Sequence, residues 1–203
     1  MHPQWKNKRV GLALGSGGAR GWAHLGVLEV LKEKGVAVDR VAGVSMGAAV
    51  GAFFAAGRSP VLRDLAVNLD WNRLRQFFWE ISLSRSGLTD GKRLLEETAN
   101  LLGASAFEEL GLPMRAVATD LATGGEVVLA AGDLLQALRA SISIPGLFSP
   151  VRLDGRLLVD AGWSIRCPSM WCATWARRWS LPWMCRRAMS RRKNLRGMSA
   201  TRR

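Results

Sequence analysis

The sequence predicts an α/β fold with a mostly parallel central sheet, and three features of its first 60 residues support this. An apolar run at 10–14 enters a glycine cluster, after which apolar residues recur at helical spacing. A second apolar run, at 41–44, enters a Gly-Val-Ser-Met-Gly turn and continues as a small-residue apolar stretch at 48–56. Glycine closes both helical stretches. Strands that alternate with helices in this way lie parallel in one sheet, with the helices packed on its faces.

The first helix is expected to be amphipathic. Its apolar stripe has four members: Trp22, Leu25, Leu28 and Leu31. Its end carries two cations and a glycine: Lys32, Lys34 and Gly35. Cations interact favourably with a helix C-terminus, and glycine adopts the left-handed conformation that follows it. The second helix is expected to stop at Gly57 and Pro60.

Residues 60–112 are expected to be mostly helical. Asp90 is the expected N-cap of a helix from Gly91 to Leu102, and Gly103 ends it. The aromatic-rich stretch 69–79 is interpreted as a helix packed on the core, with an acyl-chain pocket or a bilayer surface as the alternatives.

The stretch from 114 to 160 is expected to contain two strands, a helix and a hairpin, in the order 114–119, 126–129, 133–142 and 151–160. Asp133 is best explained as the N-cap of the helix, and Pro145 prevents its continuation. Asp154-Gly155 is a dipeptide that favours a two-residue hairpin turn. Asp160 is then the last residue of a strand.

Composition divides the chain into a nearly neutral globular region (residues 1–162) and a basic tail (residues 163–203). All 16 Asp and Glu and 18 of the 29 Lys and Arg lie in the globular region, so its net charge is +2, whereas the whole chain carries +13. The other 11 basic residues, the three cysteines and five of the nine tryptophans lie in the tail. This distribution argues against a specific nucleic-acid partner for the globular region.

The cysteine content and the lengths of the apolar runs bear on the cellular compartment of the protein. The globular region has no cysteine, so it cannot form a disulfide, and this fits a reducing compartment. The apolar stretch 48–56 is about half of the roughly 20 residues that a membrane span needs. The run 10–14 is shorter than the roughly 7–15 apolar residues of a signal peptide. We therefore expect a cytoplasmic protein, with peripheral contact at the inner membrane face.

Ser45 is the candidate nucleophile. It lies between Gly43 and Gly47 at a sharp reversal from a strand to a helix, where a Cβ at either flanking position would collide with neighbouring elements. This geometry holds the serine at the carboxyl edge of the sheet, over the positive end of a helix. The alternative is a structural turn serine.

The glycine loop from Gly15 to Gly21 allows three interpretations. A dinucleotide-binding G-x-G-x-x-G fits poorly, because counting from Gly15 puts Arg20 at the third glycine position. An oxyanion hole fits better, since consecutive N–H groups at a helix start can bind a negative oxygen and an elbow serine follows about 25–30 residues later. A tight turn without a ligand remains the third.

A serine nucleophile needs a base, and the sequence offers few. His2 lies close to the N-terminus, and His24 lies one turn past the glycine loop, where we expect a structural or supporting role. Asp160 is the better candidate and would act on Ser45 directly. Because a carboxylate is a weak base toward a hydroxyl, geometry, desolvation and oxyanion stabilisation must supply the rest. Asp120 competes on sequence alone.

Three motifs together resemble those of the patatin-like phospholipases, and a fourth stretch is similar. They are Gly17–Gly21, Gly43–Gly47, Asp160–Gly162 and the stretch Ser141–Phe148. The resemblance covers about residues 9–162 and is greatest to bacterial members. It implies a three-layer α/β/α fold with a mostly parallel sheet. The further motif positions are Gly15, Gly21, Gly43, Gly47, Ala161 and Gly162. Two departures are Ser16 and Ala161, where glycine is commoner.

The resemblance also implies a chemistry. It implies a Ser45–Asp160 dyad without histidine, and an oxyanion hole from the loop amides of Gly17, Gly18 and Ala19 with Arg20 supporting the loop. The implied reaction is hydrolysis of lipid acyl esters through an acyl-enzyme, with no metal and no cofactor. A lipid or acyl-ester substrate and peripheral membrane contact are the expected partners.

The tail 163–203 departs from the family, which continues with a loop, a helix and a buried strand. Trp is encoded only by TGG and Met only by ATG. Read one nucleotide earlier, permitted codons from Trp163 onward can spell Leu-Val-Asn-Pro-Val-Pro-Val-Asp-Val-Val-Arg-Asp-Met-Gly-Ala-Glu-Val-Val-Ile-Ala-Val-Asp-Val. The hypothesis is that the tail is translated out of frame and poorly ordered, leaving the hydrolase domain 1–162 incomplete at its C-terminal side.

Two alternatives stay open for the whole chain. One is a real basic, tryptophan-rich tail that binds anionic lipid or nucleic acid. The other is an inactive remnant of a hydrolase, since a lost strand and helix would expose the sheet beside Asp160.

Overall fold

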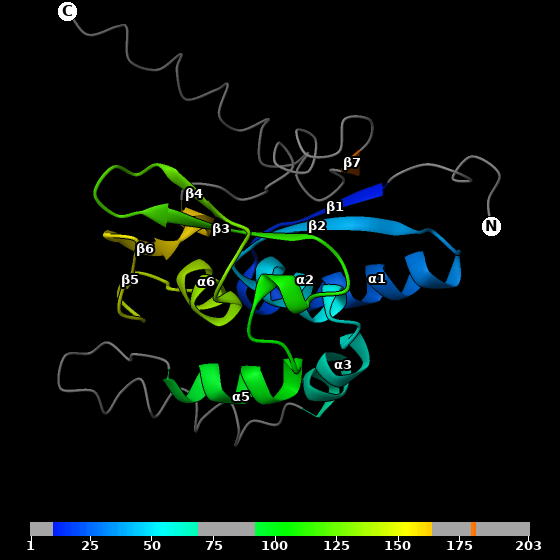
Figure 1. Ribbon diagram of the computed structural model, residues 1–203. Coiled ribbons are helices and arrows are strands. Elements are labelled where there is room, and N and C mark those ends of the chain that lie inside the picture. Colours follow the sequence, from blue (N-terminus) through cyan, green and yellow to red (C-terminus); the bar gives the residue numbers. More distant parts are fainter. Residues whose placement is uncertain (1–9, 69–91, 164–179, 182–203) are drawn as a thin grey trace, which may run out of the picture.

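The computed structural model describes residues 10–68, 92–163 and 180–181 (Figure 1). The aromatic stretch 69–79, the expected cap Asp90 and nearly all of the tail lie outside these residues. Within them, strands and helices alternate as expected, and the predicted α/β class is confirmed.

The strands form one mixed sheet in the order β5-β6-β3-β2-β1-β7, and β4 also pairs with β3. Four strands are mutually parallel: β1 (Val10–Leu14), β2 (Val38–Val44), β3 (Met114–Asp120) and β7 (Ser180–Leu181). Three strands are in antiparallel pairs: β4 (Glu126–Leu129), β5 (Val151–Leu153) and β6 (Arg156–Asp160). The parallel centre is therefore extended by an antiparallel hairpin.

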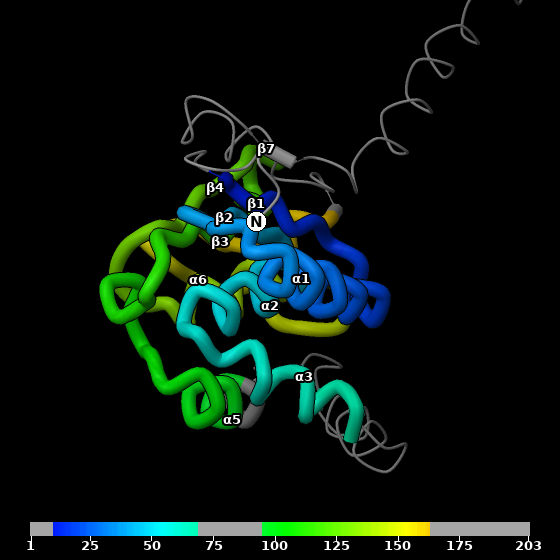
Figure 2. Tube along the Cα trace, turned by 90° about the vertical axis from the view of Figure 1, so that its right-hand side faces the viewer, coloured from blue at the N-terminus to red at the C-terminus, as the bar shows by residue number. Residues whose placement is uncertain are grey.

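Five α-helices are described: α1 (Ala23–Glu33), α2 (Met46–Ala55), α3 (Ser59–Val67), α5 (Lys92–Leu102) and α6 (Leu134–Ser141). Short 3-10 helices are η2 (Gly18–Trp22), η3 (Phe107–Glu109) and η4 (Ala161–Trp163). In both ribbon and tube views α1, α2 and α6 lie on one face of the sheet, and α3 and α5 lie beyond α2 (Figures 1 and 2).

Several boundaries differ from the sequence-based expectation. The strand expected at 41–44 begins at Val38, because β1 extends the pairing to that residue. The helix expected at 48–56 starts directly after Ser45, so the reversal from strand to helix takes a single residue. The Asp133 side chain accepts a hydrogen bond of 2.9 Å from the amide of Gln136, which confirms the expected N-cap.

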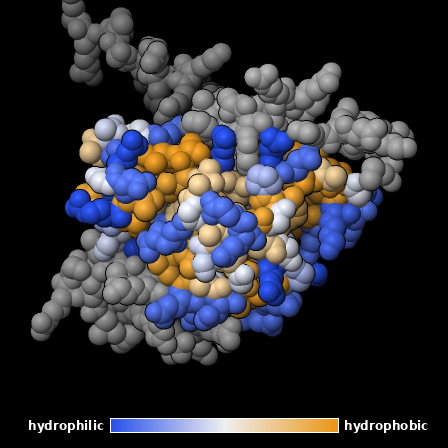
Figure 3. Space-filling view, viewed as in Figure 1, coloured by the Kyte–Doolittle hydropathy of each residue, from blue (hydrophilic) through white to orange (hydrophobic). Residues whose placement is uncertain are grey.

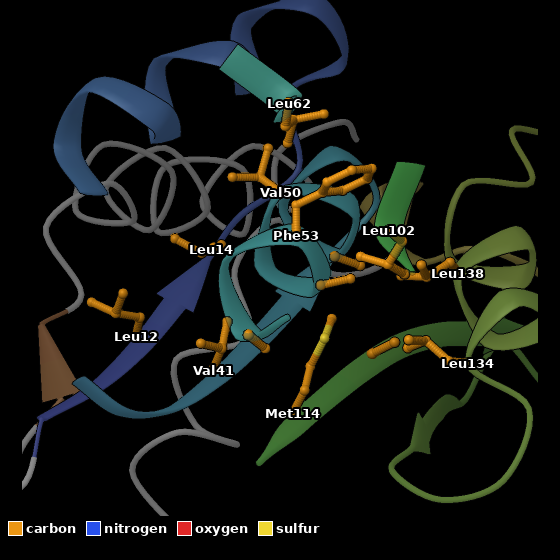
Figure 4. Close-up of a cluster of buried hydrophobic side chains, with 14 of the residues drawn as sticks. Leu12, Leu14, Val41, Val50, Phe53, Leu62, Leu102, Met114, Leu134 and Leu138 are labelled. Carbon is orange, nitrogen blue, oxygen red and sulfur yellow. The ribbon is translucent and has the colours of Figure 1, made fainter. Parts of the chain in front are cut away.

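The main core lies between the sheet and its helices, and α2 is at its centre (Figure 4). Val50 and Phe53 of α2 and Val41 and Met114 of the sheet belong to it, and each is less than 5% exposed. Gly51 lets α2 approach the sheet, since a Cβ there would lie 2.9 Å from Cγ1 of Val41. The helix that follows Ser45 is therefore packed closely against the sheet.

The surface of the described residues mixes hydrophilic and hydrophobic side chains on the face shown in Figure 3. No helix in the ranges 10–68 and 92–163 has both the length and the apolar character needed to cross a bilayer.

Candidate active site

Strand pairing on β3 brings two distant chain segments together. On β3, residues 114–117 pair with β2, and residues 118–120 pair with β6. β4 pairs with residues 116–119, so it shares paired residues with both of the other strands. A strand has two edges, so β2 and β6 must share the edge opposite β4. β2 runs parallel to β3 and β6 runs antiparallel, so their carboxyl ends meet head-on.

The residues at this meeting point are the candidate nucleophile and base. Val44, the last residue of β2, pairs with Val117, and Asp160, the last residue of β6, pairs with Ala118. Ser45 follows Val44 directly. Two neighbouring positions of β3 thus bring together side chains that are 115 residues apart in sequence, and the Oγ of Ser45 donates a 2.6 Å hydrogen bond to Oδ2 of Asp160.

Ser45 lies in an unusual backbone conformation, with φ 55° and ψ −126°. A residue with a Cβ rarely adopts these backbone angles, and the strain persists only where the surroundings hold the residue in place. The next residues enter α2, so Ser45 lies at the helix N-terminus, where the dipole favours negative charge. The serine is 6% exposed.

The two glycines that flank the elbow are required by close packing. A Cβ on Gly43 would lie 2.4 Å from the carbonyl oxygen of Gly47. A Cβ on Gly47 would lie 2.2 Å from the carbonyl oxygen of Leu14, at the end of β1. The first contact keeps β2 against α2, and the second keeps α2 against β1, which leads into the glycine loop.

Asp160 is buried and accepts two hydrogen bonds. Its Oδ2 accepts from Ser45, and its Oδ1 accepts from the amide of Gly162 at 2.6 Å. Burial raises the pKa of the Asp160 carboxyl above its ordinary value, because desolvation disfavours the charged form. The hydrogen bonds from Ser45 and Gly162 stabilise the carboxylate and oppose part of this rise. A desolvated carboxylate is a stronger base than an exposed one.

The glycine loop lies beside this pair. A Cβ on Gly162 would be 2.8 Å from Oδ1 of Asp160 and 2.9 Å from Oγ of Ser16, so the loop approaches the turn that follows Asp160. A Cβ on Gly21 would be 2.2 Å from Cγ of Met46, so the other end of the loop packs on the start of α2.

The loop amides divide into two groups. The amide of Arg20 donates to the carbonyl of Gly17 at 3.1 Å, so it holds the loop together. Gly18 and Ala19 begin the 3-10 helix η2, and the first amides of a helix have no partner inside it. Gly18 adopts φ +52°, which turns the chain into η2.

Other sequence candidates for the base are accounted for by local structure. His24 is buried, and its Nε2 lies 2.9 Å from the carbonyl oxygen of Gly15, so it supports the glycine loop. Asp120 accepts a 2.9 Å hydrogen bond from the amide of Ala122 within its own turn. His2 lies outside the described residues. Among the residues that the structure describes, no group of three or more His, Cys, Asp or Glu could hold a metal ion.

Two serines that were not predicted as site residues from the sequence also join the site: Ser141, the last residue of α6, and Ser143, just after the helix. Ser141 Oγ accepts a 2.9 Å hydrogen bond from the amide of Ser45, and the carbonyl of Ser143 accepts one of 2.8 Å from the amide of Asp160. Both serines are fully buried. A serine near a helix end is so common that their only sequence signal is their place in the stretch 141–148.

Comparison with known proteins finds a matching family model and several relatives. Residues 12–169 match the family model for patatin-like phospholipase. An NTE family protein of Mycobacterium bovis is 44% identical over 154 residues, which are 76% of this chain and 42% of that protein. The neuropathy target esterase sws of Drosophila melanogaster is 30% identical over 166 residues, which cover 79% of this chain and 12% of that protein. The chain thus spans less than half the length of these relatives.

The fold also resembles a solved structure. VipD from Legionella pneumophila superposes with a TM-score of 0.52 at 14% sequence identity, over 76% of this chain and 46% of that one. At this level of identity the likeness concerns the fold alone.

Proposed function

This chain belongs to the patatin-like phospholipase family, and we propose that it is a serine acyl-hydrolase that cleaves lipid acyl esters through a Ser45–Asp160 dyad. The observation that carries the proposal is the 2.6 Å hydrogen bond between Ser45 Oγ and Asp160 Oδ2 at the strained elbow. A hydroxyl that already donates to a desolvated carboxylate has its proton acceptor in place before substrate arrives.

In the first half of the proposed reaction, Ser45 Oγ attacks the acyl carbonyl carbon while its proton moves to Oδ2 of Asp160. The carbonyl π electrons move to oxygen and form a tetrahedral oxyanion. Amides of Gly17, Gly18 and Ala19, together with the N-terminal dipole of α2, stabilise this charge. The oxyanion then collapses, the ester C–O bond breaks, and Asp160 returns the proton to the departing alcohol.

In the second half, water attacks the acyl-enzyme. Asp160 takes a proton from the water, a second tetrahedral oxyanion forms in the same place, and its collapse releases the fatty acid. The proton returns from Asp160 to Ser45 Oγ, which restores the starting state. The pair needs neither a metal ion nor a histidine for these steps, because the carboxylate accepts and returns every proton.

Acyl-ester hydrolysis by purified full-length protein tests this proposal, with lysophosphatidylcholine and a chromogenic short-chain ester as substrates. We expect Ser45→Ala to lower kcat by about 10⁴-fold or more, and Asp160→Asn by about 10²–10⁴-fold. His24→Gln keeps an N–H donor for the Gly15 carbonyl but removes any imidazole base, so it should retain most of the activity. Loss of activity in His24→Gln with retention in Asp160→Asn would point to a Ser–His pair instead.

A further inference from the structure

Building on the proposed function, we propose that the segment Ser141–Ser143 is a positioning element that fixes the main chain of both dyad residues, with Ser141 as the positioning residue for the nucleophile. The segment begins at Ser141, the last residue of α6, and this helix packs against β3 and β6 (Figure 1). Its two hydrogen bonds to the dyad residues come from main-chain amides, so it acts on where Ser45 and Asp160 lie without touching the reacting atoms.

The Ser141 hydroxyl takes the place of a backbone hydrogen bond between β2 and β3. The pairing of β2 with β3 ends at Val44 and Val117, and the next amide of the elbow, that of Ser45, turns away from the ladder. Ser141 Oγ accepts from this amide at 2.9 Å and donates to the carbonyl of Val117 at 2.8 Å. One hydroxyl thus links the elbow to β3 at the point where the backbone ladder stops.

This link matters because Ser45 is strained. Its φ of 55° lies in a region that non-glycine residues rarely occupy, so the residue would relax if the surroundings allowed it. Relaxation would rotate the peptide that carries the Ser45 amide and move Oγ away from Asp160. Ser141 is 0% exposed, so no bulk solvent is available to take over its hydrogen bond.

The other end of the segment holds the base. The carbonyl of Ser143 accepts a 2.8 Å hydrogen bond from the amide of Asp160, at the end of β6. Only Ile142 therefore separates the residue that contacts the nucleophile from the residue that contacts the base. This spacing makes the Ser45–Asp160 distance depend on one short and rigid piece of backbone.

Arg139 fixes this piece of backbone from the preceding turn of α6. Its guanidinium is buried, donates to Ser143 Oγ and to the carbonyl of Ser149 at 3.2 Å, and lies 4.9 Å from the centroid of the Phe148 ring. The Ser143 hydroxyl in turn donates to the carbonyl of Arg139 at 2.6 Å. These contacts tie the end of α6 to the loop that follows it.

The test compares Ser141→Ala, which removes the hydroxyl, with Ser141→Thr, which keeps it. Leu102→Val in α5 is the control for a general loss of core packing, since Leu102 is 1% exposed and far from the elbow in sequence. We expect Ser141→Ala to lower kcat on the order of 10–100-fold with little change in KM, because a small misplacement of Oγ weakens the chemical step. Ser141→Thr should recover most of this loss, and Leu102→Val should leave kcat close to that of the parent chain.

A second readout does not depend on activity. Amide hydrogen exchange is measured by NMR for Ser45 and for Val41 of β2, whose amide donates to the carbonyl of Pro113 at 3.0 Å. We expect Ser141→Ala to speed exchange at Ser45 by at least about 10-fold more than at Val41, and Leu102→Val to change both alike.

The two readouts separate the two proposals. If the parent chain hydrolyses no ester, the proposed function fails, while Ser45 exchange still decides the role of Ser141. Equal acceleration at Ser45 and Val41 in Ser141→Ala, or a kcat that Ser141→Thr fails to restore, would overturn the positioning role.

Discussion

At the scale of single residues, the pair of Ser45 and Asp160 combines a strained donor with a desolvated acceptor. Neither feature favours stability. A residue at φ 55° stores strain of the order of 1–3 kcal/mol, and a buried carboxylate loses hydration that two hydrogen bonds replace only in part. Such arrangements persist where function requires them, so the site should be less stable than an inert version of itself.

Asp160→Asn is expected to stabilise the folded protein at neutral pH although it lowers activity. Because burial raises the pKa of Asp160 in the folded state, the folded protein binds this proton more tightly than the unfolded chain does. The stability from the protonated carboxyl is present at low pH and is lost as pH rises through the raised pKa. At neutral pH, where the parent carries the buried carboxylate in its charged form, the asparagine variant should therefore have a higher Tm than the parent.

The same comparison has a pH signature. The difference in Tm between Asp160→Asn and the parent chain should shrink as pH falls below the raised pKa of Asp160, where both side chains are neutral. Calorimetry between about pH 4 and 8 measures it. A variant that is less stable than the parent at every pH would show that the carboxylate is well compensated in the folded protein.

At the scale of elements, the elbow depends on how closely α2 approaches the ends of β1 and β2. Gly47→Ala is expected to disrupt this approach, because its Cβ would lie 2.2 Å from the carbonyl oxygen of Leu14 and 2.6 Å from that of Gly15. Both obstacles are backbone, so relief requires α2 to shift. We expect a loss of about 1–3 kcal/mol in the free energy of unfolding, together with a fall in kcat.

Gly26→Ala is the matched control. Gly26 lies in the interior of α1, and a Cβ there meets nothing within 4 Å. Replacing it by alanine should stabilise the helix by up to about 1 kcal/mol. Urea unfolding curves of the two variants give the comparison. If both glycines respond alike, close packing does not explain the elbow.

The order of elements and the elbow could be anticipated from the sequence because each has a local signal. Glycines mark the turns, apolar runs mark the strands, and Asp133 marks a helix start. The head-on meeting of β2 and β6 has no local signal, because both strands pair with the same edge of β3 and the residues that meet lie more than a hundred positions apart. The contact of Ser141 with the elbow depends on the same long-range packing, so only the structure reveals it.

At the scale of the whole molecule, the amino-acid composition changes abruptly at about residue 163, and this change needs an explanation. We propose that the tail is read out of frame. In the shifted frame, the codons of Met170-Trp171-Cys172 must read as Val-Val at 171 and 172. The codons of Trp183-Met184-Cys185 must read as Asp-Val at 184 and 185. Both results hold whatever codons are used for the neighbouring residues. These forced residues agree with the expected helix and buried strand.

The position of β7 supports this proposal. Ser180–Leu181 pairs parallel with β1 at the edge of the sheet, and it falls inside the range 179–185 where the shifted frame can spell Val-Val-Ile-Ala-Val-Asp-Val. A run rich in β-branched residues is typical of a strand buried in a parallel sheet. Sequencing the genomic locus tests the proposal. We expect a one-base correction near codon 163 to open a frame with these residues, whereas a stop codon shortly after 163 in that frame would exclude it.

The most direct test of the central claim is the site and rate of covalent labelling by a fluorophosphonate probe, followed by peptide mass spectrometry of the full chain. We expect one adduct, on Ser45, formed at a rate that falls by about 10²-fold or more in Asp160→Asn. No adduct on Ser45, or labelling of Ser45 at an unchanged rate in Asp160→Asn, would contradict a dyad in which the carboxylate activates the serine.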